Sequence, residues 1–217
     1  MICGADEEGG IAATGESEIL AGSSVSLAMD DLRARDDRVQ KADQYLASMG
    51  FTPATEDTAD NFFGIKHAYS GQPEGADAEQ SYELYLQEYS NPASEMTAAV
   101  GRIVLRDSAG TYASTYTFIL EAPKADVSSI REYYVGGSPG KLEIGEANSW
   151  WTCILGQLPA VGEECGDSID RCSPATSIVG YIGCVATNCG LAFSSASICC
   201  SCGCARWCSW AYGCCRM

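Results

Sequence analysis

The 217-residue sequence is poor in basic side chains and has almost no histidine. It contains 13 lysines and arginines against 29 aspartates and glutamates, a formal charge of −16, and a single histidine, His67. One histidine excludes multi-histidine metal centres and leaves little material for histidine acid–base catalysis. The negative charge argues against nucleic acid as a charge-driven partner.

The N-terminal segment, residues 1–24, lacks the basic start and apolar run of a secretory signal peptide. The chain is therefore expected either to stay in the cytosol or to have an export signal outside this sequence. The segment is rich in glycine, alanine, serine and glutamate, so we expect a flexible acidic N-terminus.

Cysteine is scarce in the first two thirds of the chain and abundant in the last third. Residues 1–150 hold Cys3 alone, with 25 acidic and 10 basic residues, whereas residues 151–217 hold 12 cysteines with 4 acidic and 3 basic residues. This density is above the roughly 8–10 % that marks a disulfide scaffold. Regions of such different chemistry are not expected to share one core, so the sequence predicts two domains, 25–146 and 147–217.

The acidic region has the composition of proteins that work at high salt, because the chain contains only four lysines and many acidic and small residues. At about 1 M salt the Debye length is about 3 Å, so repulsion among surface carboxylates almost disappears. We expect a halophilic source, with an ordinary acidic mesophilic protein as the alternative.

Residues 25–146 are predicted to form an α+β domain. Apolar residues recur every three, four or seven positions from Val25 to Met49, as on one face of an amphipathic helix, and Gly50 follows as a stop. Beyond Gly50 the apolar period falls towards two, which indicates strands. The predicted strands are Phe62–Tyr69, Tyr82–Tyr89, Ala99–Arg106, Thr111–Glu121, Ile130–Val135 and Lys141–Glu146. We expect one amphipathic helix on an antiparallel meander of five or six strands, with a hairpin turn at Asp107–Gly110.

The acidic region contains no recognisable catalytic motif. It lacks a Gly-x-Ser-x-Gly elbow, a phosphate-binding glycine loop and a paired-histidine helix. His67 lies in a strand pattern, where a lone histidine is usually structural. The pairs Asp30-Asp31 and Asp36-Asp37 are expected on a solvated helix face. We therefore expect no enzyme activity, no cofactor and no metal site, and instead a binding or chaperoning role.

The C-terminal region is predicted to be a small, mainly helical domain held by disulfides. Six bridges would use the following twelve cysteines: Cys153, Cys165, Cys172, Cys184, Cys189, Cys199, Cys200, Cys202, Cys204, Cys208, Cys214 and Cys215. Their pairing cannot be read from the sequence. A bridge contributes about 2–4 kcal/mol, which matters in a domain too small for a large core. Thiolate binding of a metal is the alternative for the crowded tail.

An uncharged stretch runs from Cys172 to Ala205. It is long enough to cross a bilayer of about 30 Å, but polar residues interrupt it. Two short helices with a break near Asn188–Gly190 are therefore the main prediction. The residues predicted to face either a membrane or the acidic region are Ile178, Val179, Tyr181, Ile182, Val185, Leu191 and Phe193.

The segment Gly136–Gly140 between the two regions is rich in turn-forming residues. Exposed segments of this composition are favoured protease sites, so we expect a processing cut between Gly136 and Trp151. A β-turn leading into one last strand is the alternative. A cut would separate a nearly neutral, cysteine-rich peptide from an acidic partner.

These parts resemble the precursors of small cysteine-rich halocins, the peptide bacteriocins of halophilic archaea, and in particular those of the C-eight type. The resemblance is carried by Cys153–Cys215, above all by Cys172-x11-Cys184-x4-Cys189-Gly-Leu and the cysteine-dense end. It implies a secreted precursor that is cut into an antimicrobial C-terminal peptide and an N-terminal immunity protein. The implied partners are these two products, which bind each other, and the membrane of the target cell. A secreted structural or adhesive protein and a thiolate metal-binding protein stay open as alternatives.

Overall fold

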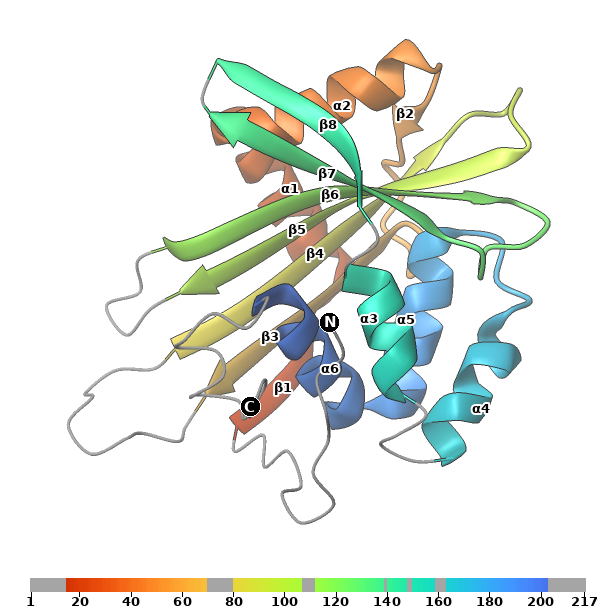
Figure 1. Cartoon of the computed structure of the whole chain (residues 1–217). Coiled ribbons are helices and arrows are strands. Elements are labelled where there is room, and N and C mark those ends of the chain that lie inside the picture. Colours follow the sequence, from red (N-terminus) through yellow and green to blue (C-terminus); the bar gives the residue numbers. More distant parts are fainter. Residues whose placement is uncertain are drawn as a thin grey trace.

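The computed structural model describes residues 15–69, 80–106, 112–138, 140–147, 150–158 and 163–202. Within them the chain forms an eight-stranded antiparallel sheet with helices on both faces (Figure 1). The strands are β1 Gly15–Ile19, β2 Thr52–Pro53, β3 Phe62–Tyr69, β4 Gln80–Ser90, β5 Met96–Arg106, β6 Tyr112–Pro123, β7 Arg131–Ser138 and β8 Lys141–Ala147. The helices are α1 Gly22–Arg35, α2 Asp37–Ser48, α3 Trp150–Gln157, α4 Glu163–Cys172, α5 Ile178–Cys189 and α6 Leu191–Cys202.

The sheet has the order β1-β3-β4-β5-β6-β7-β8, and β2 pairs with the end of β4. From β3 to β8 each strand pairs with the next one along the chain, which makes a meander. All six predicted strands are confirmed, and β3 has the predicted bounds. The α+β region followed by a disulfide-rich, mainly helical region is therefore the observed fold class.

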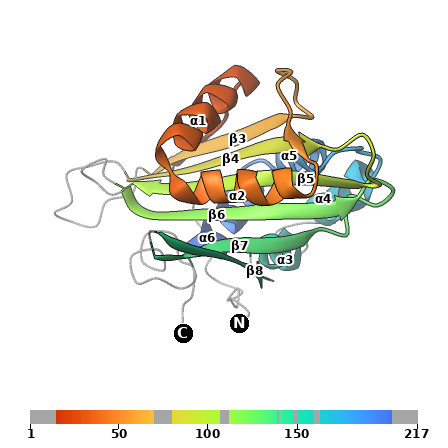
Figure 2. The same cartoon turned by 90° about the horizontal axis from the view of Figure 1, so that it is seen from above.

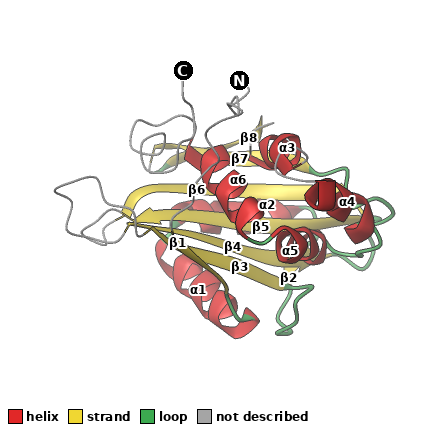
Figure 3. Cartoon of the chain, turned by 90° about the horizontal axis from the view of Figure 1, so that it is seen from below, coloured by secondary structure: helices red, strands yellow, loops and turns green. Residues whose placement is uncertain are grey.

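Two helical layers enclose the sheet. Figure 2 shows α1 and α2 on one side of it and α3–α6 on the other, and Figure 3 shows the second layer from below. The strands alternate between the layers: Leu84 and Leu86 of β4 join the core on the side of α3–α6, whereas Tyr89 joins the core on the side of α1 and α2. Because both faces of the sheet are buried, apolar residues are needed at successive positions of the strands and not only at alternate ones.

The expectation of two separate cores is wrong. One cluster of buried residues combines Leu84 and Phe118 of the sheet with Trp150, Ile182 and Phe193 of the cysteine-rich region. The physical reason is that α1 and α2 cover one face of an amply apolar sheet, and the other face needs a cover of its own. The predicted domain limits at residues 25 and 147 are not tested by this packing and stay predictions.

The single predicted helix is in fact two helices. α1 ends at Arg35, and Asp36 is extended, with φ −116° and ψ 110°, before α2 begins. The Asp36 side chain accepts a hydrogen bond from the Arg38 amide at 2.9 Å and forms an ion pair with Arg102 of β5. The break therefore places a capping carboxylate against a buried arginine.

The prediction of a flexible segment over residues 1–24 is wrong for its second part. Residues Gly15–Ile19 form β1, which pairs with β3, and α1 begins at Gly22. Residues 1–14, which include Cys3, lie outside the described residues. The predicted turn Asp107–Gly110 also lies outside them, although the two strands that it joins are antiparallel neighbours.

The predicted pair of short helices in the uncharged stretch is confirmed. α5 and α6 meet at Gly190, whose φ of 53° favours glycine, and the axes bend by 119°. No single helix of the described part is long and apolar enough to cross a membrane. The bent pair passes that test only as a whole.

Disulfide bonds are present in the C-terminal region, as predicted. Cys153–Cys200 joins α3 to α6, and Cys165–Cys189 and Cys172–Cys184 join α4 to α5. Cys199 is disulfide-bonded as well. The four predicted bridge cysteines Cys204, Cys208, Cys214 and Cys215 lie outside the described residues.

Candidate functional site: the sheet face that holds the cysteine-rich helices

The main contact between the two regions is the sheet face on which α3–α6 pack, which we call the docking face. It consists of buried side chains of β3–β6 and is formed by Phe63, Ile65, Tyr82, Leu84, Leu86, Ala99, Ile103, Leu105, Phe118 and Leu120. These side chains share one face because alternate strand residues point the same way. The docking face is thus a continuous apolar surface contributed by the acidic region.

Six of the seven residues predicted to form a contact face are brought together on this surface. The side chains of Ile178, Val179, Tyr181, Ile182, Val185 and Phe193 are fully buried. Leu191 differs, because it is 53 % exposed at the start of α6. Burying one such side chain is worth about 1.5–3 kcal/mol, so apolar contact dominates the attraction between the regions.

Two aromatic pairs cross the contact and join β6 to α3 and β3 to α6. The ring centroids of Phe118 and Trp150 are 4.9 Å apart, and Phe63 and Phe193 meet edge to face at 6.4 Å. Within the cysteine-rich region Trp151 meets Tyr181 at 5.8 Å. Such pairs add about 0.5–1.5 kcal/mol beyond area burial.

A carboxylate of the acidic region caps the first helix of the cysteine-rich region. Glu132 of β7 is buried, and its carboxylate accepts hydrogen bonds from the Trp150 and Trp151 amides at 3.1 and 3.0 Å and from the Tyr116 hydroxyl at 2.9 Å. The first amides of a helix have no partner inside the helix, and its N-terminus favours negative charge. Glu132 satisfies both requirements of α3.

A second carboxylate caps α5 in the same way. Glu88 of β4 is buried and accepts hydrogen bonds from the Val179 amide at 3.0 Å and from the hydroxyl of Thr97. Burial raises the pKa of Glu88 to about 7, although both hydrogen bonds act to lower it. The carboxyl group of Glu88 therefore changes its charge near neutral pH.

The loop before β3 completes the grip on α5. Ser177, the N-cap, accepts a hydrogen bond from the Gly180 amide at 3.0 Å and donates one to the Asp60 carbonyl at 2.9 Å. A Cβ on Gly180 would lie 2.5 Å from the Asp60 carboxylate. Glycine at this position therefore lets the acidic loop approach the helix.

A third polar contact lies at α6. The hydroxyl of Tyr82, fully buried on β4, is 2.5 Å from the Ser197 hydroxyl and 3.4 Å from that of Ser201. Burial raises the pKa of Tyr82 to about 12. The hydroxyl stays protonated at neutral pH, so this contact is a neutral hydrogen bond.

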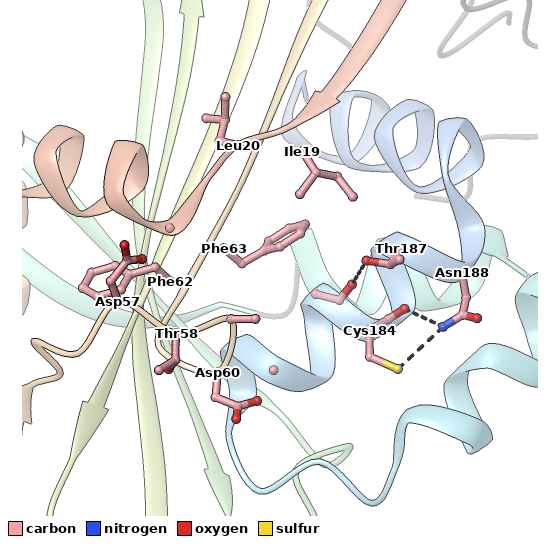
Figure 4. A pocket seen from close by; sticks show the side chains of 14 residues that line it. Ile19, Leu20, Asp57, Thr58, Asp60, Phe62, Phe63, Cys184, Thr187 and Asn188 are labelled. Atoms are coloured by element: carbon pink, nitrogen blue, oxygen red, sulfur yellow. Dashed lines mark hydrogen bonds between the residues drawn. The ribbon is translucent and has the colours of Figure 1, made fainter.

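A pocket of about 530 Å³ marks the rim where the regions meet (Figure 4). Ile19, Leu20 and Asp57 line it from the acidic region, and Thr187 and Asn188 line it from α5. The two α5 side chains bond to carbonyls of their own helix, at 2.8 Å each. These bonds keep the donors of both side chains within α5, and we take the contact between the regions as the candidate site.

His67 and the acidic pairs have structural surroundings. His67 is buried in β3, its Nδ1 is 2.7 Å from the Ser17 hydroxyl of β1, and burial lowers its pKa. Asp30 and Asp31 form exposed ion pairs with arginines of their own helix, α1, as a solvated face predicts. Asp36 departs from this expectation through its pair with buried Arg102.

The segment predicted to contain a processing cut is largely folded. β7 and β8 pair as a hairpin through Gly137 and Gly140, with φ of 106° and 80°, so the alternative of a turn leading into a last strand is observed. Trp150 and Trp151 are buried. Residues 148–149, between β8 and α3, lie outside the described part of the chain.

Sequence reasoning missed both capping carboxylates. Glu88 shares its strand phase with Leu84 and Leu86, so an inward-facing charge was a readable signal on β4. The partner of such a charge is a helix N-terminus far away in the sequence, and strand periodicity carries no information about it.

The candidate site is therefore the contact between the disulfide-bonded helices α3–α6 and the docking face, as its packing and hydrogen bonds describe it. Comparison with protein-family models, with curated proteins and with solved structures gave no match to this chain.

Proposed function

We propose that the chain is a bacteriocin precursor of the halocin type, in which the acidic region neutralises the C-terminal peptide. The observation that carries this proposal is the burial of the apolar α5 face on the docking face, with Glu88 and Glu132 at the two helix starts. A toxic peptide whose apolar face is covered in this way cannot present it to a target. The acidic region would act as its immunity protein.

The proposal includes secretion and processing. Disulfides form and persist in oxidising compartments, and three of them hold α3–α6. Cleavage ahead of Trp150 would leave the cysteine-rich region as a separate peptide. The acidic composition supports a halophilic source, where carboxylate repulsion is screened.

The membrane of the target cell is the second proposed partner. When the peptide leaves the docking face, the apolar side chains of α5 and the buried Trp150 and Trp151 become available. Tryptophan favours the boundary between lipid and water because its ring is apolar and its N–H is polar. Loss of membrane potential in treated cells is the expected signature.

The test is a mass measurement joined to a killing assay. Protein from the native culture medium should yield a C-terminal fragment whose mass rises by two hydrogens per bridge on reduction. This fragment should kill related cells, and cells that express residues 1–149 should survive it. A harmless fragment, or unprotected cells, would contradict the proposal.

The alternatives give different results in the same samples. An adhesive or structural protein would show no cut between the regions and no killing. A thiolate metal-binding protein would give free thiols on titration and extra mass from metal, but six described cysteines are paired with one another in disulfides.

A further inference from the structure

Two carboxylates beside the docking face, those of Glu88 and Glu132, bond to main-chain groups of the cysteine-rich region. Glu132 accepts from the amides of Trp150 and Trp151, and Glu88 accepts from the amide of Val179. None of these three hydrogen bonds depends on a side chain of the peptide. What both carboxylates contact is the start of a helix.

The two contacts are made by separate strands and grip separate helices. Glu88 lies on β4 and Glu132 on β7, and the helices that they cap, α5 and α3, begin 28 residues apart at Ile178 and Trp150. Two fixed carboxylates define two points in space. A ligand meets both only if its two helix starts have the matching separation.

Disulfides and chain continuity together connect the two helix starts on the side of the peptide. Cys153–Cys200 ties α3 to α6, and Cys172–Cys184 ties α4 to α5. α5 leads into α6 through Gly190, so the two cross-linked helix pairs form one connected unit that carries both helix starts. Preorganisation of this kind lowers the entropic cost of binding.

We propose, on the basis of the proposed function, that the acidic region recognises its peptide by two helix N-termini. Glu132 binds the N-terminus of α3, and Glu88 binds the N-terminus of α5. The partner class is therefore a disulfide-bonded helical peptide with two helix starts at this spacing. The chain's own peptide is one member, and peptides with other side chains at the capped positions are also ligands. The apolar contact provides the attraction, and the two carboxylates fix the position of the peptide on the sheet.

The test uses the full chain with a site-specific protease sequence inserted between Asn148 and Ser149. After cutting, the retained fraction of peptide is measured by size-exclusion chromatography over a dilution series. Glu88→Ala and Glu132→Ala should each raise the dissociation constant about tenfold, because each leaves helix amides without an acceptor. Glu88→Gln and Glu132→Gln keep an acceptor oxygen and should change it less than about threefold.

The matched control is Glu121→Ala. Glu121 is a buried carboxylate of β6 beside Tyr133, on the sheet face covered by α1 and α2, and its removal should leave retention unchanged. Circular dichroism of each uncut variant checks folding. If an alanine variant does not fold, the Gln variants and the peptide-side pair below decide the outcome.

The peptide-side pair is Val179→Ala and Val179→Pro. Both lose the valine side chain, but only proline also loses the N–H that Glu88 accepts, and proline is tolerated in a first helical turn. Proline should weaken retention about tenfold more than alanine, and this difference should vanish when Glu88→Ala is also present. A difference that persists, or retention in Glu88→Ala and Glu132→Ala equal to that of the unmodified chain, would overturn the inference.

Failure of the proposed function is read separately. The peptide is released from the cut chain in urea, refolded by dilution and applied to related cells. A peptide that does not kill removes the bacteriocin role but leaves the retention data to judge the helix-start recognition. A peptide that kills, joined to unchanged retention in all variants, removes only the recognition.

Discussion

The two faces of the sheet hold their helices by different chemistry. On the face of α1 and α2, charged side chains pair with each other, as Arg33 does with Asp43 at 2.7 Å and Arg102 with Asp36. On the docking face, Glu88 and Glu132 bond to main-chain amides and to hydroxyls. On the first face, specific pairs of charged side chains hold the helices. On the second, carboxylates bind the N-terminal ends of helices that pack on an apolar surface.

This difference fits the proposed function, in which α1 and α2 stay on the sheet and α3–α6 are released from it. A buried ion pair loses a great deal when one partner is removed, because the other charge is left in a poorly polar environment. An apolar contact with capping carboxylates can be broken without leaving a basic group buried. The comparison predicts a graded series of effects.

The largest effect is expected on the face covered by α1 and α2, from Asp36→Ala. This substitution removes the carboxylate that pairs with Arg102 and the N-cap of α2, and should lower the free energy of unfolding by about 4 kcal/mol. Urea unfolding measures it. Asp37→Ala is the control, since Asp37 is exposed in the first turn, and a loss under about 1 kcal/mol is expected there. Equal losses for both would contradict the contrast.

Removal of single disulfides should follow the length of the closed loop. The bridge Cys153–Cys200 spans 47 residues and Cys172–Cys184 spans 12. Loop-entropy arguments give about 4 kcal/mol for the first and about 3 kcal/mol for the second. Thermal unfolding of the two double-alanine variants provides the measurement, and a reversed order would show that chain entropy does not control these bridges.

Stability should also depend on pH through Glu88. Its pKa is about 7 in the folded chain against an ordinary 4.5, because burial and nearby Asp60 outweigh the amides of α5 and the Thr97 hydroxyl. A raised pKa gives a contribution that is complete below pH 4.5 and is lost as the pH rises through 7. Relative to Glu88→Gln, the chain should lose up to about 3 kcal/mol between pH 5 and 8. Parallel pH profiles of the two proteins in urea unfolding would refute this.

The smallest effect is expected from an exposed ion pair within α1. Arg35 and Asp31 are 2.7 Å apart, with side chains 77 % and 52 % exposed. Exposed pairs contribute about 0–1 kcal/mol and are screened by salt. Arg35→Ala should therefore change the free energy of unfolding by less than about 0.5 kcal/mol. A larger loss in molar salt would point to a role of Arg35 outside this pair.

The sequence allowed much of the acidic sheet to be predicted, because alternation of side chains is a local property. The polar residues that interrupt the uncharged stretch also predicted a break near Asn188–Gly190, and α5 and α6 meet at Gly190. Sequence reasoning failed at Asp36, because the apolar spacing of a helix continues past this residue and does not reveal the break that its ion pair with Arg102 accompanies. It also missed β1, whose short polar sequence shows little alternation.

The shared core and the caps were harder to foresee, since composition shows how two regions differ but not which surfaces they bury together. The docking face can be recognised only once the strands are aligned in one sheet, because that alignment shows which alternate residues share a face. Glu88 and Glu132 acquire their role from helix starts that lie 91 and 18 residues further along the chain, at Val179 and Trp150.

The three described disulfides affect how the cysteine-rich region would respond to a protease. Their cysteines are nested along the chain: Cys153–Cys200 encloses Cys165–Cys189, which encloses Cys172–Cys184. A peptide bond broken anywhere inside the outer bridge leaves both pieces covalently joined. If the regions are separated by a protease as proposed, a second cut between Cys153 and Cys200 would therefore not divide the cysteine-rich region, because the outer bridge still joins the pieces.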